Sequence, residues 1–174
     1  ENFSNNQESL QDFITQAALF CVYLEDAEQP KKSEFIEKML YFLPLLYTKI
    51  KQLSCPNLTM DGVPERFATE EEYNIIRNKV ETILGTDDAY LEVFMEDFRY
   101  SDEPITAFIS ENIADIYQEL NNLVGNWQID NDDIKHDALA ICMEAFKEHW
   151  GQKLVNVLRP LHALSLESNE EIYY

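Results

Sequence analysis

Residues 104–127, PITAFISENIADIYQELNNLVGNW, decide the fold class of this chain. Their apolar side chains recur at steps of three and four positions, which is the spacing of one face of an α-helix. The stripe comprises Ile105, Phe108, Ile109, Ile113, Ile116, Tyr117, Leu120, Leu123, Val124 and Trp127. Pro104 suits the first helical position, because the N–H that proline lacks has no intrahelical partner there. We therefore predict a helix over this stretch that buries one broad face in a core.

Two amphipathic segments precede this helix in the chain. Residues 8–26 repeat apolar side chains at the same helical spacing. A second helix is predicted from Ser33, a good N-cap, to about Leu53, with a kink at Pro44. Both segments need a partner for their apolar faces, which a helical bundle provides.

Turn-forming residues separate these two helices from a third. Residues 54–68 combine two prolines with an Asp-Gly pair, a composition typical of a loop. Thr69 and Glu72 have the spacing of a capping box, and Gly85 ends the helix that they begin. Residues 87–100 fit a helix by their aromatic spacing and a strand by their alternation, and we predict mostly helix.

The C-terminal third of the chain reads as one long helix. Residues 130–133 supply its cap, and it continues to about Leu164 with a bend at Pro160. No period of 20 to 50 residues repeats, which excludes a solenoid. The predicted fold is all-α, an irregular antiparallel bundle of five to six helices. It comprises a polar N-terminal extension at 1–7, a single helical domain at 8–166 and a C-terminal tail at 167–174.

The charge of the chain narrows the function classes. The 174 residues include 33 Asp and Glu against 13 Lys and Arg, a formal charge of −20. Nucleic acids and anionic lipids are bound mainly by Lys and Arg, so neither nucleic-acid nor membrane binding is expected. The longest apolar run, Met39 to Tyr47, has nine residues and contains Pro44, whereas a membrane span needs about twenty.

The cysteines indicate the compartment. Cys21, Cys55 and Cys142 are odd in number and far apart, without a C-x-x-C pair. This pattern fits neither a disulfide framework nor a zinc site. The N-terminus shows no basic segment followed by an apolar run, so no signal peptide is predicted. We expect a cytoplasmic location.

Four short strings resemble one known family as a group. They are YLEVF at 90–94, YSD at 100–102, ADIYQ at 114–118 and WGQKLVN at 150–156. Together they resemble an uncharacterised bacterial all-helical family, a domain of unknown function. The resemblance runs from the first helix to about Leu164 and implies an all-α fold and a bacterial cytosolic setting. It implies no catalytic or binding residue.

The middle of the second helix suggests an interaction surface. Tyr41, Pro44 and Leu45 lie off its apolar stripe, so this part of the helix is apolar nearly all round. Excess apolar surface of this kind marks a contact with another protein or with a second copy. Our first hypothesis is a non-enzymatic protein-interaction or accessory module that needs no cofactor, with Tyr41 and Leu45 at its contact.

Carboxylates at helical spacing suggest a second hypothesis. Glu92 and Glu96 are four positions apart, as are Glu111, Asp115 and Glu119, so each set would line one helix face. Facing carboxylates could hold Mg²⁺ or Mn²⁺ for a nucleotide phosphohydrolase, with Glu92, Glu96, Glu111 and Asp115 as ligands. All-α nucleotide pyrophosphatases use E-x-x-E and E-x-x-D motifs, and the spacing here departs from that pattern. An ordinary solvated face is the expected alternative.

A third hypothesis rests on charge alone. Residues 87–119 contain ten acidic residues and Arg99 as their one cation, a net charge of −9. Such a surface could mimic nucleic-acid phosphates and compete for a partner that binds them. We rank this regulator hypothesis last.

One histidine is a catalytic candidate. Counting 100° per residue puts His149 in the middle of the apolar face of the last helix, beside Trp150. A buried histidine is usually a hydrogen-bonded core residue. If His149 faces Asp115, Glu119 or Asn112 across the core, the pair could act as a general base.

Overall fold

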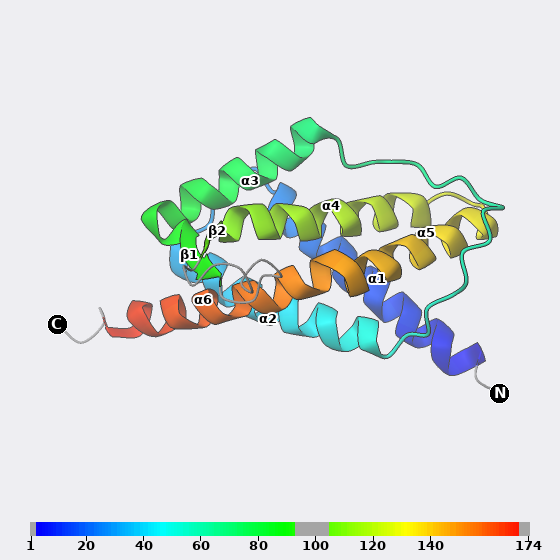
Figure 1. Ribbon diagram of the computed structural model, residues 1–174, viewed down its shortest axis with the longest axis horizontal. Coiled ribbons are helices and arrows are strands. Elements are labelled where there is room, and N and C mark those ends of the chain that lie inside the picture. Colours follow the sequence, from blue (N-terminus) through cyan, green and yellow to red (C-terminus); the bar gives the residue numbers. More distant parts are fainter. Residues whose placement is uncertain (1–2, 93–104, 171–174) are drawn as a thin grey trace.

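The computed structural model describes residues 3–92 and 105–170. In these residues the predicted all-α fold is confirmed, and one small hairpin is the sole β-structure (Figure 1). The helices are α1 Phe3–Glu25, α2 Lys32–Lys51, α3 Glu70–Leu84, α4 Ile109–Trp127, α5 Asp132–Ala145 and α6 Gly151–Glu170. The remaining elements are the 3₁₀ turn η1 Gly85–Asp88, the antiparallel strands β1 Ala89–Glu92 and β2 Ile105–Phe108, and the π-helical turn η3 Phe146–Trp150.

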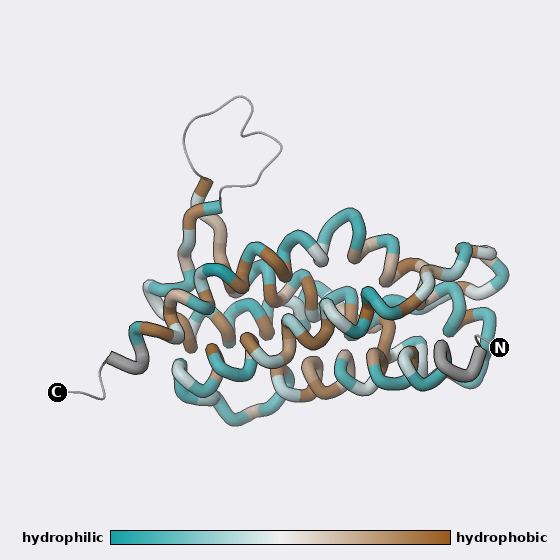
Figure 2. The backbone as a smooth tube through the Cα atoms, turned by 90° about the horizontal axis from the view of Figure 1, so that it is seen from below, coloured by the Kyte–Doolittle hydropathy of each residue, from teal (hydrophilic) through white to brown (hydrophobic). Residues whose placement is uncertain are grey.

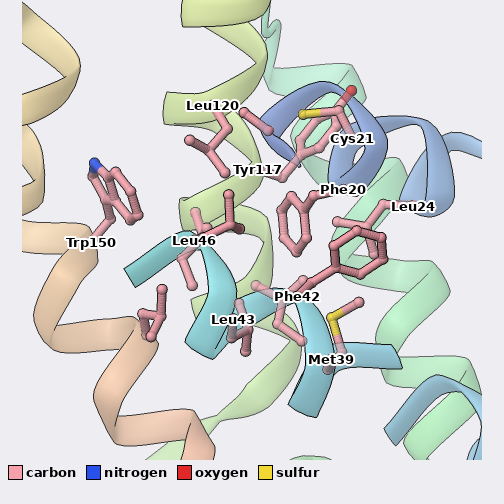
Figure 3. Close-up of a cluster of buried hydrophobic side chains, with 14 of the residues drawn as sticks. Phe20, Cys21, Leu24, Met39, Phe42, Leu43, Leu46, Tyr117, Leu120 and Trp150 are labelled. Carbon is pink, nitrogen blue, oxygen red and sulfur yellow. The ribbon is translucent and has the colours of Figure 1, made fainter. Parts of the chain in front are cut away.

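Helix α4 lies at the centre of the bundle, with α1, α3, α5 and α6 packed against it. Its predicted apolar stripe explains this position, because the inner residues are buried from Ile109 onward. Figure 3 shows side chains from several helices converging on one cluster, among them Phe20 of α1, Leu43 of α2 and Tyr117 of α4. Trp150 of η3 closes the cluster from the side of α6.

A buried carboxylate fixes the start of α4. Asp88 accepts hydrogen bonds from the N–H of Ser110 at 2.7 Å and from its hydroxyl at 2.6 Å. The N–H groups of the first helical turn have no acceptor within the helix. Both residues are buried, so Asp88 is the acceptor here in place of water. The helix predicted from Pro104 therefore begins only at Ile109, and residues 105–108 are a strand.

The helix predicted over residues 87–100 is wrong for its described part. Residues 89–92 form β1, in which Glu92 is buried and Leu91 is exposed. In the sequence, the alternation of these side chains favoured a strand, whereas the spacing of the aromatic side chains favoured a helix. Pairing with β2 explains why this segment is a strand. Figure 2 shows the two strands leaving the bundle as an arm. Residues 93–100 lie outside the described residues.

Several helix ends differ from the predictions. α1 begins at Phe3 rather than at residue 8, and α6 continues to Glu170 rather than to about Leu164. α2 begins at Lys32, so Ser33 lies inside the helix instead of capping it. Periodicity marks an apolar face, and these polar ends carry no such signal. None of the described helices combines the length and the apolar character that crossing a membrane requires.

A long connection between α2 and α3, residues 52–69, runs along one end of the bundle (Figure 1), and we refer to it as the strap. Two asparagines of α4 hold it. Asn126 accepts a hydrogen bond from the N–H of Glu65 and donates one to its carbonyl, both at 2.8 Å. Asn122 accepts from two successive N–H groups of the strap, at 2.8 and 2.9 Å. Hydrogen bonds to these side-chain amides thus satisfy strap backbone groups that regular secondary structure would otherwise pair.

Asp137 of α5 is the third anchor of the strap and is fully buried. Its carboxylate accepts hydrogen bonds at 3.0 Å from the N–H of Thr59, the hydroxyl of Thr59 and the N–H of Gly62. The bond from the Thr59 N–H is the main reason why the pKa of Asp137 lies below its usual value. The charged form of Asp137 therefore stabilises the fold.

The variant Asp137→Asn should loosen the strap, because the amide offers one acceptor oxygen where the carboxylate offers two. A depressed folded-state pKa contributes stability above the unfolded-state value of about 4, and this is lost as the pH falls through the folded value. The midpoint of thermal unfolding should therefore fall more steeply from about pH 5 to pH 3 in the parent protein than in the variant. Amide exchange near Thr59 should also be faster in the variant at neutral pH. Parallel pH profiles would contradict the anchoring role.

Candidate functional site

The π-turn η3 decides which side chains face the core after α5. A π-helical turn holds more residues than an α-helical turn, so the helix faces shift across it. Trp150 lies in the core, and its Nε1–H donates to the carbonyl of Cys142 at 3.0 Å. His149, predicted to be buried, is exposed, with 70% of its side chain accessible. That prediction is wrong because it assumed a rotation of 100° per residue throughout, whereas the π-turn shifts the faces of the helix.

A polar cleft opens beside this turn, between the strap, α4 and α5. Its volume is about 490 Å³, and its polar lining includes Arg66, Glu119, Glu148 and His149. The Nε2 atom of His149 lies 3.7 Å from a carboxylate oxygen of Glu148. The strap positions Arg66, and α4 positions Glu119, so the anchors of the strap also shape the cleft.

Glu119 is a carboxylate of this cleft whose pKa is raised by its surroundings. Burial raises its pKa above the usual value, and the positive charges of Arg66 and His149 oppose that shift. Asp115, one turn earlier on α4, raises the pKa of Glu119 further. The structure thus places His149 within electrostatic range of Glu119, on an exposed rim rather than across the core.

The other carboxylates of α4 have separate neighbours. Asp115 forms an ion pair with Lys153 of α6 at 2.5 Å. Burial is the main cause that raises the pKa of Tyr73, and Asp115 adds to it. Glu111 is exposed, and its backbone carbonyl accepts a hydrogen bond from Tyr73 at 3.5 Å. Asp115 therefore bridges α3 and α6 over the surface of α4.

Glu92 takes part in a different contact, at the base of the arm. It is buried and accepts a hydrogen bond from the Tyr90 hydroxyl at 3.2 Å. Asn112 of α4 donates to the same hydroxyl. Asn112 thus ties the arm to the bundle.

These positions bear on the predicted metal site. Within residues 3–92 and 105–170, no three His, Cys, Asp or Glu side chains gather where they could hold a metal ion. Glu92 lies at the arm, whereas Glu111 and Asp115 lie toward α3 and α6. Glu96 lies outside the described residues. The described carboxylates give the phosphohydrolase hypothesis no assembled ligand set.

The half-buried Cys55 of the strap is the accessible thiol nearest the cleft. Burial is the main cause that raises its pKa, and its Sγ donates to a carboxylate oxygen of Glu144 at 3.2 Å. A thiol in this state is a poor nucleophile at neutral pH. Cys55 therefore does not supply the cleft with an activated nucleophile.

The outer face of α2, comprising Glu34, Lys38, Tyr41 and Leu45, is the second candidate site. Tyr41 is 61% exposed and Leu45 is half-buried. Glu34 and Lys38 are exposed beside them. α2 packs against α1 and α6 through its opposite face, and on the outer face the Tyr41 ring contacts the neighbouring Phe42 ring edge-on, with the centroids 5.8 Å apart.

Sequence reasoning missed the anchors of the strap and the role of Arg66. The available signal was the pair Asn122 and Asn126 on one face of α4, with Gly125 between them. A Cβ at Gly125 would lie 2.4 Å from the Phe67 ring, so glycine is what lets the strap approach. Two asparagines four positions apart beside a glycine therefore mark a place where a helix holds a loop.

Comparison with known proteins agrees with the resemblance seen in the sequence. No curated protein matches the chain. The crystal structure of protein BF1032 from Bacteroides fragilis, a structural-genomics target, is similar with 40% identity and a TM-score of 0.80. The alignment covers 90% of this chain and 91% of that chain. The profile of a domain of unknown function, DUF5063, matches residues 4–167. The chain therefore belongs to the DUF5063 family.

Proposed function

We propose that the protein is a non-enzymatic interaction module that associates with a second copy of itself through the outer face of α2. The observation that carries the proposal is the exposure of Tyr41, 61% of which is accessible on an otherwise well-packed helix. Large aromatic side chains left exposed beside other apolar residues are characteristic of contact surfaces. Leu45 and Pro44 extend this apolar surface along the helix.

The local charge favours a second copy as the occupant. Residues 31–51 contain five lysines and two glutamates, a formal charge of +3 in a chain of −20. Two copies therefore repel each other least where these segments meet. A two-fold interface pairs a surface with itself, so the surface must contain its own complement. The exposed side chains of Lys31, Glu34, Glu37 and Lys38 give this surface both signs of charge, which such self-pairing needs.

Sedimentation equilibrium tests the proposal. The parent protein should show a monomer–dimer equilibrium that strengthens with added salt, because salt screens the net repulsion. The double variant Tyr41→Ala/Leu45→Ala should weaken association about 30-fold, the effect of losing contacts that together contribute about 2 kcal/mol. Both side chains lie at the surface, so the variant should keep the parent's circular dichroism spectrum.

The variant Val63→Ala is the matched control. Val63 is 79% exposed but lies on the strap, so its truncation should leave the dimer unchanged. A parent protein that stays monomeric at every concentration would refute the proposal. A dimer that the double variant leaves intact would place the interface elsewhere and refute it as well.

A further inference from the structure

We infer that the groove between α1 and α3 binds an amphipathic helix with a basic rim from a partner protein. α1 and α3 both pack against α4, and a groove of about 730 Å³ remains between them with α4 as its floor. Figure 1 shows the end of α1 rising behind α4 toward α3. This groove is distinct from the outer face of α2, so the inference stands independently of the proposed function.

The walls of the groove are apolar and accessible. Val22 of α1 is 63% exposed, and Ile75 of α3 is 57% exposed. Ala18 lies one turn before Val22 on the same wall, and the half-buried Val124 of α4 contributes to the floor. Apolar side chains on two helix walls are what the apolar face of a third helix contacts in helix-in-groove recognition.

The ends of the walls are acidic. Glu25 and Asp26 end α1, and Glu72 lies in the first turn of α3. α1 also ends here, and the C-terminus of a helix carries partial negative charge. Lys79 is the cation of the groove, and it is already engaged, because its Nζ donates to the carbonyls of Leu24 and Asp26.

The acidic charge of the groove favours a basic partner segment. Lys and Arg beside the apolar face of a partner helix would meet the negative charge of Glu25, Asp26 and Glu72. Glu25 and Glu72 keep this charge while they accept hydrogen bonds within the chain, Glu25 from the Tyr117 hydroxyl and Glu72 from the N–H of Thr69. Two copies do not pair groove to groove, because the groove is itself acidic. An anionic membrane is repelled for the same reason. A basic amphipathic segment of another protein fits both the apolar walls and the acidic ends.

Fluorescence anisotropy with a defined probe tests the inference. The probe is a labelled 18-residue peptide of Leu and Lys with its leucines on one helical face. A scrambled peptide of the same composition is its control. The parent protein should bind the amphipathic peptide at least about tenfold more tightly than the scrambled one, since charge alone cannot use the apolar walls. Binding of both peptides should weaken with salt.

Two groove variants and one control variant locate the site. Val22→Ser/Ile75→Ser should weaken binding of the amphipathic peptide about tenfold or more, and both positions are exposed, so the fold should persist. Tyr41→Ala/Leu45→Ala, on the other surface, should bind as the parent does. Equal binding by the groove variant, or equal binding of the scrambled peptide, would overturn the inference. Altered sedimentation of the groove variant would identify a second copy as the occupant, and capture by anionic vesicles would identify a membrane; either would overturn it.

Discussion

Replacing Trp150 by alanine should lower the free energy of unfolding by about 3–5 kcal/mol, the range for truncating a large buried aromatic side chain. Trp150 is 1% exposed and contacts the Phe146 ring edge-on, with the ring centroids 4.7 Å apart. Its truncation removes this contact and leaves a cavity at the junction of α2, α4 and the π-turn. Urea unfolding followed by circular dichroism measures the loss.

The variant Trp150→Phe separates packing from hydrogen bonding. It keeps a ring in the core but removes the Nε1–H that donates to Cys142, so a loss of about 1–2 kcal/mol is expected. If Trp150→Ala costs less than Trp150→Phe, the indole does not fill the core as described. A large change in the slope of the urea transition would instead show that the variant no longer unfolds in two states.

The second large effect is expected at Asp88. Asp88→Ala leaves the buried N–H and hydroxyl of Ser110 without an acceptor, which should cost about 2–4 kcal/mol. Asp88→Asn keeps one acceptor oxygen, so its cost should be smaller. Thermal and urea unfolding measure both losses, and amide exchange should show that the first turn of α4 opens more readily in Asp88→Ala.

A neighbouring carboxylate provides the control for Asp88. Asp87 is partly exposed and pairs with Lys32 at the surface, so Asp87→Ala should cost less than about 1 kcal/mol. Equal losses for Asp87→Ala and Asp88→Ala would show that general charge, rather than the bond to Ser110, stabilises this turn.

The helices could be predicted wherever one periodic face meets the core. The stripe from Ile109 to Trp127 identified α4, and the pattern of Thr69 and Glu72 identified the start of α3 through a capping box that the structure contains. The arm was missed because the contact that sets the start of α4 joins Asp88 to Ser110, 22 positions apart. No local spacing reports a contact of that kind.

The candidate sites were predictable in part for the same reason. Tyr41 was identified from its position off the stripe of α2, and it is exposed. The prediction for His149 was wrong because the local sequence pattern does not indicate the π-turn. The extra residue of this turn is evident only from the buried position of Trp150 in the structure. The polar cleft depends on Arg66, which the strap brings to α4, and that proximity exists only in the folded chain.

Photo-crosslinking tests most directly whether two copies meet at α2. Tyr41 is replaced by p-benzoylphenylalanine, and the protein is prepared in ¹⁴N and ¹⁵N forms that are mixed before illumination. We expect a covalent dimer in which position 41 of one copy is joined to the α2 segment, Lys32–Lys51, of an oppositely labelled copy. A chain that stays monomeric after illumination, or a dimer joined at a segment other than α2, would contradict it.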